Sequence, residues 1–147
     1  IGLIPDGLHV HPALVKLVWR LLGRDRLNLV TDAMAAMGMP PDEYLLGDFR
    51  VKVDETSARL PDGTLAGCIL SLDAILRAFR SMTGASLPDL LATVTTTPAG
   101  LLGLGNKLGR IAPGMAADFV LMTPDLSIVE TFIAGKSTFR QQDDRAG

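Results

Sequence analysis

Two histidines and one aspartate are the side chains of this 147-residue sequence whose types and spacing could do chemistry. His9 and His11, the only histidines, are two residues apart, so on an extended segment both rings would lie on one face. Imidazole is a zinc ligand, but a mononuclear zinc site commonly takes three protein ligands. The two rings alone therefore do not predict a metal centre. We interpret His9 as a polar substrate contact at a strand end and His11 as a rim or surface residue.

The aspartate, Asp32, ends the apolar run 27–31, which is typical of a buried strand. Small residues follow it, so its carboxylate is predicted to point into a crevice at the C-terminal end of the strand. Active sites of α/β and barrel proteins are built at that end. A turn-capping aspartate is the alternative interpretation, and spacing does not separate the two.

Cysteine and glycine residues add no further reactive site. The single cysteine, Cys68, is predicted to be a small buried residue, because no histidine has a convincing local relation to it. One cysteine cannot form an internal disulfide, which indicates a reducing, cytoplasmic setting. Gly103, Gly105 and Gly109 resemble a phosphate loop only loosely, since no strand precedes them, and they are predicted to form turns.

The composition excludes several classes of protein. Hydrophobic residues make up 48% of the chain and the mean hydropathy is +0.31, which predicts a folded domain. Basic and acidic residues number 14 and 16, without a basic block, so we expect no nucleic-acid partner. No apolar run approaches about 18 residues and no basic leader opens the chain, so we expect neither a membrane span nor secretion. Because Ile1 opens a strand-like run, we expect further residues upstream.

The chain is predicted to begin with a strand–helix–strand unit. Leu3 and Ile4 read as the end of a buried strand, and Pro12 to Gly23 has helical spacing with a suitable first and last residue. The run 27–31 then supplies the second strand. Period-two alternation from Phe49 to Leu60, with a turn at 61–63, predicts a small antiparallel hairpin.

Helices are expected next, then strands. A helix is predicted over 71–84, a second one begins at the capping box of Ser86 and runs through Val94, and a third begins at Thr97. Three short strands are predicted at 118–122, 127–134 and 137–140. The polar tail 141–147 is expected to fray.

Four motifs carry a resemblance to a known family. In chain order they are Asp6-Gly7-Leu8-His9-Val10, Leu29-Val30-Thr31-Asp32-Ala33, Leu65-Ala66-Gly67, and Gly109-Arg110-Ile111-Ala112-Pro113-Gly114 with Ala117-Asp118. The sequence from residue 2 to about 140 resembles the carboxy-terminal part of the N-acetylglucosamine-6-phosphate deacetylases, in the amidohydrolase superfamily. The last motif indicates amidohydrolases in general, and the first two narrow the resemblance to the deacetylases.

The resemblance implies an α/β fold, a metal-dependent-hydrolase (β/α)₈ TIM barrel that carries a small β-sandwich domain. Residues 1–110 would form the last part of the barrel, with a hairpin insertion near 45–65, and 111–141 the returning strands of the β-sandwich, before the polar tail 142–147. A whole barrel needs about 250 residues, so this chain cannot close one. The metal ligands of the family, a His-x-His pair, a Glu and two further histidines, are expected upstream.

The activity implied by the resemblance is hydrolysis of N-acetylglucosamine 6-phosphate to acetate and glucosamine 6-phosphate. A divalent metal, zinc or iron, would polarise the amide carbonyl and lower the pKa of its water toward ~7. Asp32 would be the general acid/base and one metal ligand, and His9 a substrate contact. The backbone of Leu65, Ala66 and Gly67 would line the sugar pocket, where Gly67 allows close approach.

The resemblance also implies a cytoplasmic homo-oligomer with a phosphorylated amino sugar as substrate and neither nucleic acid nor membrane as partner. The chain alone is expected to be inactive and to hold no metal tightly, because the other ligands lie outside it. Two rival interpretations stay open. One is a non-catalytic fragment that binds no metal, and the other is a different amidohydrolase, dihydroorotase-like or deaminase-like.

Overall fold

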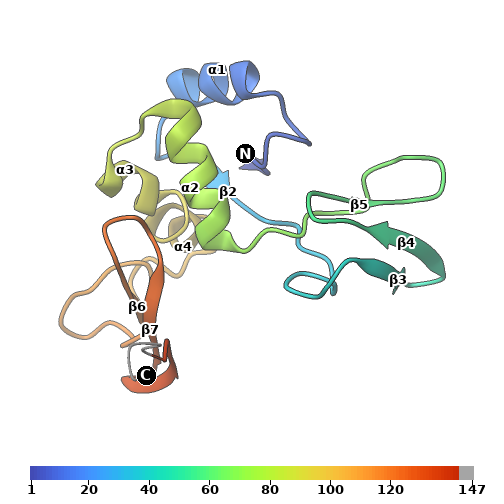
Figure 1. The fold of residues 1–147 in the computed structure, drawn as a ribbon. Coiled ribbons are helices and arrows are strands. Elements are labelled where there is room, and N and C mark those ends of the chain that lie inside the picture. The colour runs from blue at the N-terminus through green and yellow to red at the C-terminus, as the bar shows by residue number, and fades with distance from the viewer. Residues whose placement is uncertain (143–147) are drawn as a thin grey trace.

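The first elements form the strand–helix–strand unit that the sequence predicts. In the computed structural model, which describes residues 1–142, β1 (Gly2–Leu3) pairs in parallel with β2 (Asn28–Leu29). Helix α1 (Pro12–Leu22) connects them (Figure 1). Strand β2 is shorter than the predicted run 27–31. Because the two strands are parallel, the chain leaves both of them at the same edge of the pair.

Local sequence explains where the helices begin and end. Helix α1 has Pro12 in its first turn and is followed by Gly23, as predicted. Helix α2 (Leu72–Thr83) begins after Ser71 and ends at Gly84, whose φ of 69° is the left-handed conformation of a helix stop. These bounds confirm both predicted helices.

Two short helices follow α2 as predicted. The hydroxyl of Ser86 accepts a hydrogen bond from the backbone N–H of Asp89 at 3.3 Å and caps α3 (Leu87–Ala92). Helix α4 (Thr96–Leu101) begins one residue before the predicted start at Thr97.

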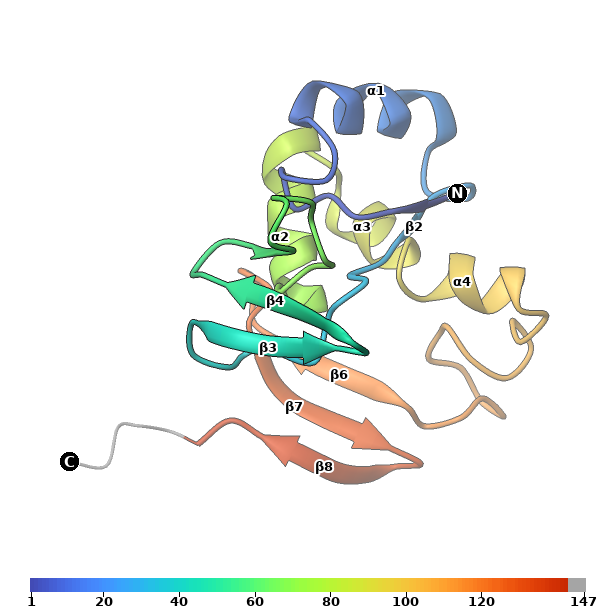
Figure 2. The same cartoon turned by 90° about the vertical axis from the view of Figure 1, so that its right-hand side faces the viewer.

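The main core lies between the parallel strands and the helices. Phe79 of α2 is fully buried, and its ring meets Trp19 of α1 edge to face, with the ring centroids 5.3 Å apart. Buried residues of this core also come from both strands and from the end of α3, and include Leu3, Val15, Leu27, Leu29, Cys68, Ile75, Leu76 and Leu90. Figure 2 shows α1, α2 and α3 together on one side of the molecule.

A separate antiparallel sheet projects from the helices, with strand order β3 (Asp42–Leu46), β4 (Phe49–Val53) and β5 (Ala58–Arg59). The predicted hairpin is therefore a three-stranded sheet, and β3 was not predicted. Its sequence, Asp-Glu-Tyr-Leu-Leu, lacks alternation, and in the structure it pairs along its whole length with β4. The predicted turn at 61–63 is confirmed, because a bridge joins Arg59 to Leu65 on either side of it.

The last sheet consists of the three predicted strands, β6 (Phe119–Met122), β7 (Ile128–Ile133) and β8 (Lys136–Arg140), in antiparallel order. Helix α2 holds its β6–β7 turn, where a guanidinium nitrogen of Arg77 donates to the carbonyl of Leu126 at 3.0 Å. Leu126 is buried in the main core. The predicted fraying of the tail falls mostly outside the described residues.

None of the helices in residues 1–142 has the length and apolar character needed to cross a lipid bilayer.

Candidate functional site

The chain after β2 places Asp32 at the surface of the described residues. Asp32 is exposed, and its φ of 48° is a left-handed conformation that Asp tolerates better than most residues. The hydroxyl of Thr31 accepts from the backbone N–H of Ala33 at 3.3 Å and so makes the turn contact that the alternative interpretation gave to Asp32. Within residues 1–142 the Asp32 carboxylate accepts no hydrogen bond from the protein.

Two cavities of the described residues lie away from Asp32. A cavity of about 510 Å³ lies beside Trp19 and Met82, and another of about 560 Å³ lies beside Asn28 and Leu101, and Asp32 lines neither. The crevice at Asp32 stays a prediction, because β2 pairs only with β1 in the described residues. A crevice at a strand end needs loops from strands on both sides.

A third segment is tied to the backbone of Asp32. The N–H of Cys68 donates to the carbonyl of Asp32 at 3.0 Å, and the N–H of Met34 donates to the carbonyl of Cys68 at 3.0 Å. Gly67 has a φ of 104°, and a Cβ built on it would lie 3.0 Å from the same Asp32 carbonyl. The group that lies close to Gly67 in the described residues is therefore the backbone of Asp32, and the approach of a sugar at Gly67 stays a prediction.

This contact makes Gly67→Ala a test of how the site is held together. The new methyl must displace the Asp32 carbonyl, so we expect the free energy of unfolding to fall by about 1–3 kcal/mol from overpacking. A further cost of roughly 1–2 kcal/mol comes from the positive φ. Gly63→Ala is the matched control, because Gly63 has a φ of 87° with nothing within 4 Å. Equal losses for the two variants in urea denaturation would contradict the role given to Gly67.

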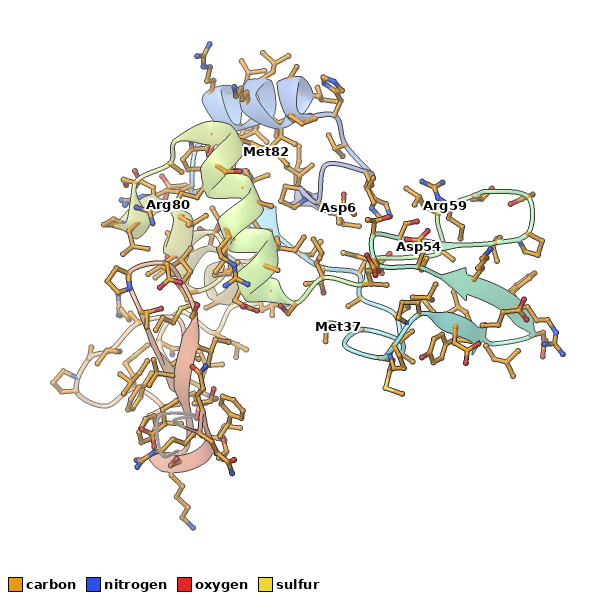
Figure 3. All side chains as sticks on the ribbon, viewed as in Figure 1. Asp6, Met37, Asp54, Arg59, Arg80 and Met82 are labelled. Carbon is orange, nitrogen blue, oxygen red and sulfur yellow. The ribbon has the colours of Figure 1, made fainter. Side chains whose placement is uncertain are left out.

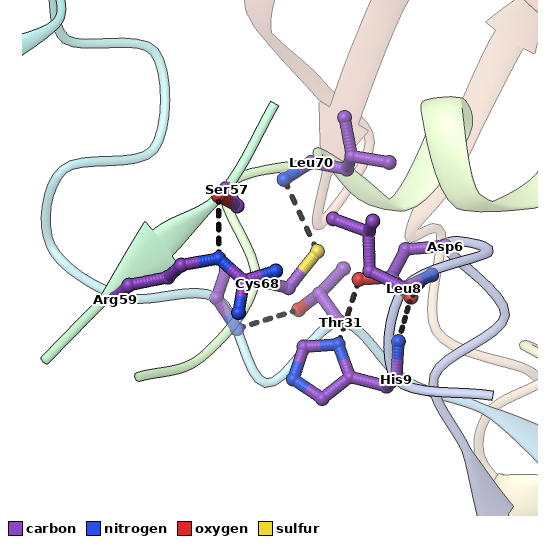
Figure 4. Close-up of polar contacts among 9 residues, drawn as sticks. Asp6, Leu8, His9, Thr31, Ser57, Arg59, Cys68 and Leu70 are labelled. Atoms are coloured by element: carbon purple, nitrogen blue, oxygen red, sulfur yellow. Dashed lines mark hydrogen bonds and ion pairs between the residues drawn. The ribbon is translucent and has the colours of Figure 1, made fainter. Parts of the chain in front are cut away.

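His9 is held by a residue that the sequence analysis missed. The Nδ1 of His9 lies 2.7 Å from Oδ2 of Asp6, and Oδ1 of Asp6 accepts from the backbone N–H groups of Leu8 and His9, both at 2.9 Å (Figure 4). Figure 3 shows Asp6 between the helices and the sheet that carries Asp54 and Arg59. An Asp followed by Gly7 is typical of an Asx turn, and a turn of this kind brings the residue three positions on, His9, close to the Asp6 carboxylate; this was the signal that could have found the pair.

The two histidines do not share a face. His11 is exposed and begins α1, where its Nδ1 accepts from the backbone N–H of Ala13 at 3.2 Å. The segment is bent after Asp6, so the extended geometry considered for the two rings is wrong. The surface position expected for His11 is confirmed.

Burial and hydrogen bonds shift the pKa values of Asp6 and Cys68. Burial by itself raises the pKa of the Asp6 carboxyl, but the hydrogen bonds from His9 and Leu8 outweigh it, so the pKa lies below its usual range. Burial raises the pKa of the Cys68 thiol, and the carboxylate of Asp6 raises it further. Cys68 is 3% exposed, which confirms the prediction of a small buried residue. Asp6 is thus an ionised carboxylate and Cys68 a neutral thiol near pH 7.

The described residues do not by themselves fit a metal ion. In residues 1–142 no three side chains of His, Cys, Asp or Glu come together as a ligand set. The Nδ1 atoms of His9 and His11 are both occupied by protein hydrogen bonds. Asp32 offers one carboxylate.

Comparison with known proteins gives the family. The Amidohydrolase family matches residues 6–138. An N-acetylglucosamine-6-phosphate deacetylase of Lysinibacillus sphaericus is 40% identical over 134 residues, which is 91% of this chain and 34% of that protein. A putative N-acetylgalactosamine-6-phosphate deacetylase of Escherichia coli strain K12 is 36% identical over 134 residues, 91% of this chain and 80% of that protein.

Solved structures give the same family. The N-acetylglucosamine-6-phosphate deacetylase of Thermotoga maritima matches with a TM-score of 0.90 and 39% identity, over 95% of this chain and 38% of that one. An aspartate-to-alanine variant of the Mycobacterium smegmatis N-acetyl-D-glucosamine-6-phosphate deacetylase was solved in complex with N-acetyl-D-glucosamine-6-phosphate. It matches with a TM-score of 0.83 and 33% identity, over 92% of this chain and 36% of that one. This chain spans about a third of the first curated relatives. The resemblance carried by the four motifs is confirmed.

Proposed function

Because the chain belongs to the amidohydrolase family, we propose that it forms part of an enzyme that deacetylates N-acetylglucosamine 6-phosphate. The products are acetate and glucosamine 6-phosphate. One observation carries the proposal: the Asp32 carboxylate is exposed at a strand end and has no partner in residues 1–142, although its backbone is held by Cys68. The names of the relatives support the choice of substrate.

In the proposed enzyme, residues 1–110 belong to the end of a (β/α)₈ barrel and 111–141 to a small β domain. The parallel β1–α1–β2 unit supports the first assignment, and the antiparallel sheet of β6, β7 and β8 supports the second. Deacetylases of this family generally depend on a divalent metal. Zinc or iron, held by this enzyme, would polarise the amide carbonyl of the substrate. The other ligands of the metal would come from outside residues 1–142. The roles proposed for this chain are therefore those of Asp32 and His9.

Asp32 moves the proton of the attacking water. As the water oxygen bonds to the amide carbon, the Asp32 carboxylate accepts a proton from it, and a tetrahedral species forms. As the carbon–nitrogen bond breaks, Asp32 gives that proton to the leaving nitrogen, so acetic acid and the amine leave and Asp32 is again ionised. The second proton of the water then passes from acetic acid to the amine, which gives acetate and the ammonium form of glucosamine 6-phosphate. An exposed carboxylate suits this role, because the water and the amide nitrogen must both reach it.

His9 holds the substrate beside this carboxylate. Its ring follows β1 and Asp32 follows β2, and parallel strands direct the segments after them to one edge. The side chain of His9 is 20% exposed, so part of the ring can reach a ligand. The backbone of Leu65, Ala66 and Gly67, joined to Asp32 through Cys68, lines the sugar pocket in this proposal.

A second candidate substrate is N-acetylgalactosamine 6-phosphate. The relative in Escherichia coli strain K12, of which this chain covers 80%, carries that name. The two sugars differ only in the configuration of one hydroxyl group, which favours a direct competition experiment.

Acetate release from each sugar phosphate tests the function. We expect the enzyme that contains this chain, assayed with added zinc or iron, to release acetate with the higher kcat/KM from N-acetylglucosamine 6-phosphate. A reversed preference would make the galactosamine compound the substrate. Release from neither sugar would refute the proposal in favour of a non-catalytic chain or a different amidohydrolase.

A further inference from the structure

The Asp6 carboxylate determines which ring nitrogen of His9 carries the proton. The Asp6 side chain is 4% exposed, and its lowered pKa keeps it ionised near pH 7. An ionised carboxylate can only accept hydrogen bonds. Since Oδ2 of Asp6 lies 2.7 Å from Nδ1 of His9, the proton of that contact must be on Nδ1. In the neutral ring, Nε2 then carries a lone pair.

We propose that Asp6 is a positioning residue that holds His9 as the Nδ1–H tautomer and presents Nε2 to the substrate. The part that concerns substrate rests on the proposed function. With Nδ1 taken by Asp6, Nε2 is the only ring nitrogen left for a ligand. A neutral ring in this form accepts a hydrogen bond at Nε2, from a hydroxyl or an amide N–H of the amino sugar.

His11 provides an internal control with the opposite tautomer. The backbone N–H of Ala13 donates to its Nδ1 at 3.2 Å, so that nitrogen carries no proton and the neutral ring is the Nε2–H form. The chain has only these two histidines. The structure therefore assigns opposite tautomers to the two rings in one molecule.

Replacement of Asp6 by Asn is expected to change the tautomer of His9 while it keeps the turn at residues 6–9. Oδ1 of the amide still accepts from the backbone N–H groups of Leu8 and His9. The amide nitrogen takes the place of Oδ2 and donates to Nδ1, which forces the ring of His9 into the Nε2–H form. An Asp-to-Asn change beside a catalytic histidine has this consequence in serine proteases.

Asp54→Asn is the matched control variant. Oδ1 of Asp54 accepts from the backbone N–H groups of Thr56 and Ser57, both at 2.8 Å, in the same i+2 and i+3 pattern. These hydrogen bonds, Thr56 first, lower the pKa of Asp54 to about 2. No histidine contacts Asp54, so this variant loses the same charge in the same kind of turn and leaves the ring of His9 unchanged.

Nitrogen NMR of the two imidazole rings tests the tautomers without any need for activity. In the ¹⁵N-histidine-labelled 147-residue chain, at a pH where both rings are neutral, we expect His9 as Nδ1–H and His11 as Nε2–H. Asp6→Asn should convert His9 to Nε2–H, and Asp54→Asn should not. A wild-type His9 in the Nε2–H form, or one that keeps Nδ1–H in Asp6→Asn, would overturn the proposal.

Deacetylase kinetics test the positioning role. We expect Asp6→Asn to lower kcat/KM roughly tenfold to a hundredfold, about the value of one strong hydrogen bond. In a His9→Ala background the same change should have little further effect, because the ring it positions is gone. Independent losses that multiply would refute the positioning role. A wild-type enzyme with the assigned tautomers and no turnover would instead refute the proposed function.

Discussion

Asp32→Asn is expected to lower kcat for deacetylation by about 10²–10⁴-fold, the usual contribution of a general acid/base. The amide of Asn keeps the size and polarity of the side chain but cannot take the proton of the attacking water. The side chain of Asp32 makes no hydrogen bond to the protein within residues 1–142, so the substitution is expected to leave the fold of this strand end intact. KM is expected to change much less than kcat. Steady-state kinetics on the enzyme that contains this chain measures both values.

Asp48→Asn is the control for this experiment. Asp48 is also exposed, but it lies in the turn between β3 and β4, in the projecting sheet. Its variant should retain the wild-type kcat. If Asp32→Asn also retained the wild-type kcat, Asp32 would have no part in the proton transfer, and the proposed mechanism would be wrong.

His9→Ala is expected to reduce kcat/KM for the deacetylation by roughly tenfold to a hundredfold, mainly through a higher KM. The substitution removes the Nε2 contact to the substrate, and leaving the substrate's donor without a partner costs about 1–3 kcal/mol. It also leaves the buried carboxylate of Asp6 without its ring partner. Substrate dependence of the initial rate gives kcat and KM separately.

His11→Ala is the matched comparison, since it removes the same side chain two positions away. Its ring caps α1 through the N–H of Ala13, so its loss should lower stability by about 1 kcal/mol and leave kcat/KM close to the wild-type value. A larger kinetic loss at His11 than at His9 would reverse the roles given to the two residues.

Features that depend on neighbouring residues in the chain were predictable. Helix α2 is specified by Ser71 before it, apolar residues at helical spacing and Gly84 after it, and all of these lie within 14 consecutive positions. The strands of the last sheet follow alternation and tight turns in the same local way. Such signals act between residues close in sequence, so no tertiary contact is needed to interpret them.

Strand β3 and the Asp6–His9 pair were missed for different reasons. The residues of β3 have no strand pattern of their own and become a strand by pairing with β4. Asp6 was visible as part of a motif, but its carboxylate could equally have faced solvent in an ordinary turn. Its burial comes from packing of the surrounding chain, which spacing does not reveal.

The motif order, with Asp32 after an apolar run, was enough to indicate the family and the candidate base, because the residue types and their order are local properties. Only the tertiary structure decided that Gly67 and Cys68 lie against the backbone of Asp32. These segments are more than 30 residues apart in the chain. Their contact depends on strand pairing and core packing. Many pairs of segments could in principle make such contacts, and the arrangement that buries the most apolar surface is the one that forms.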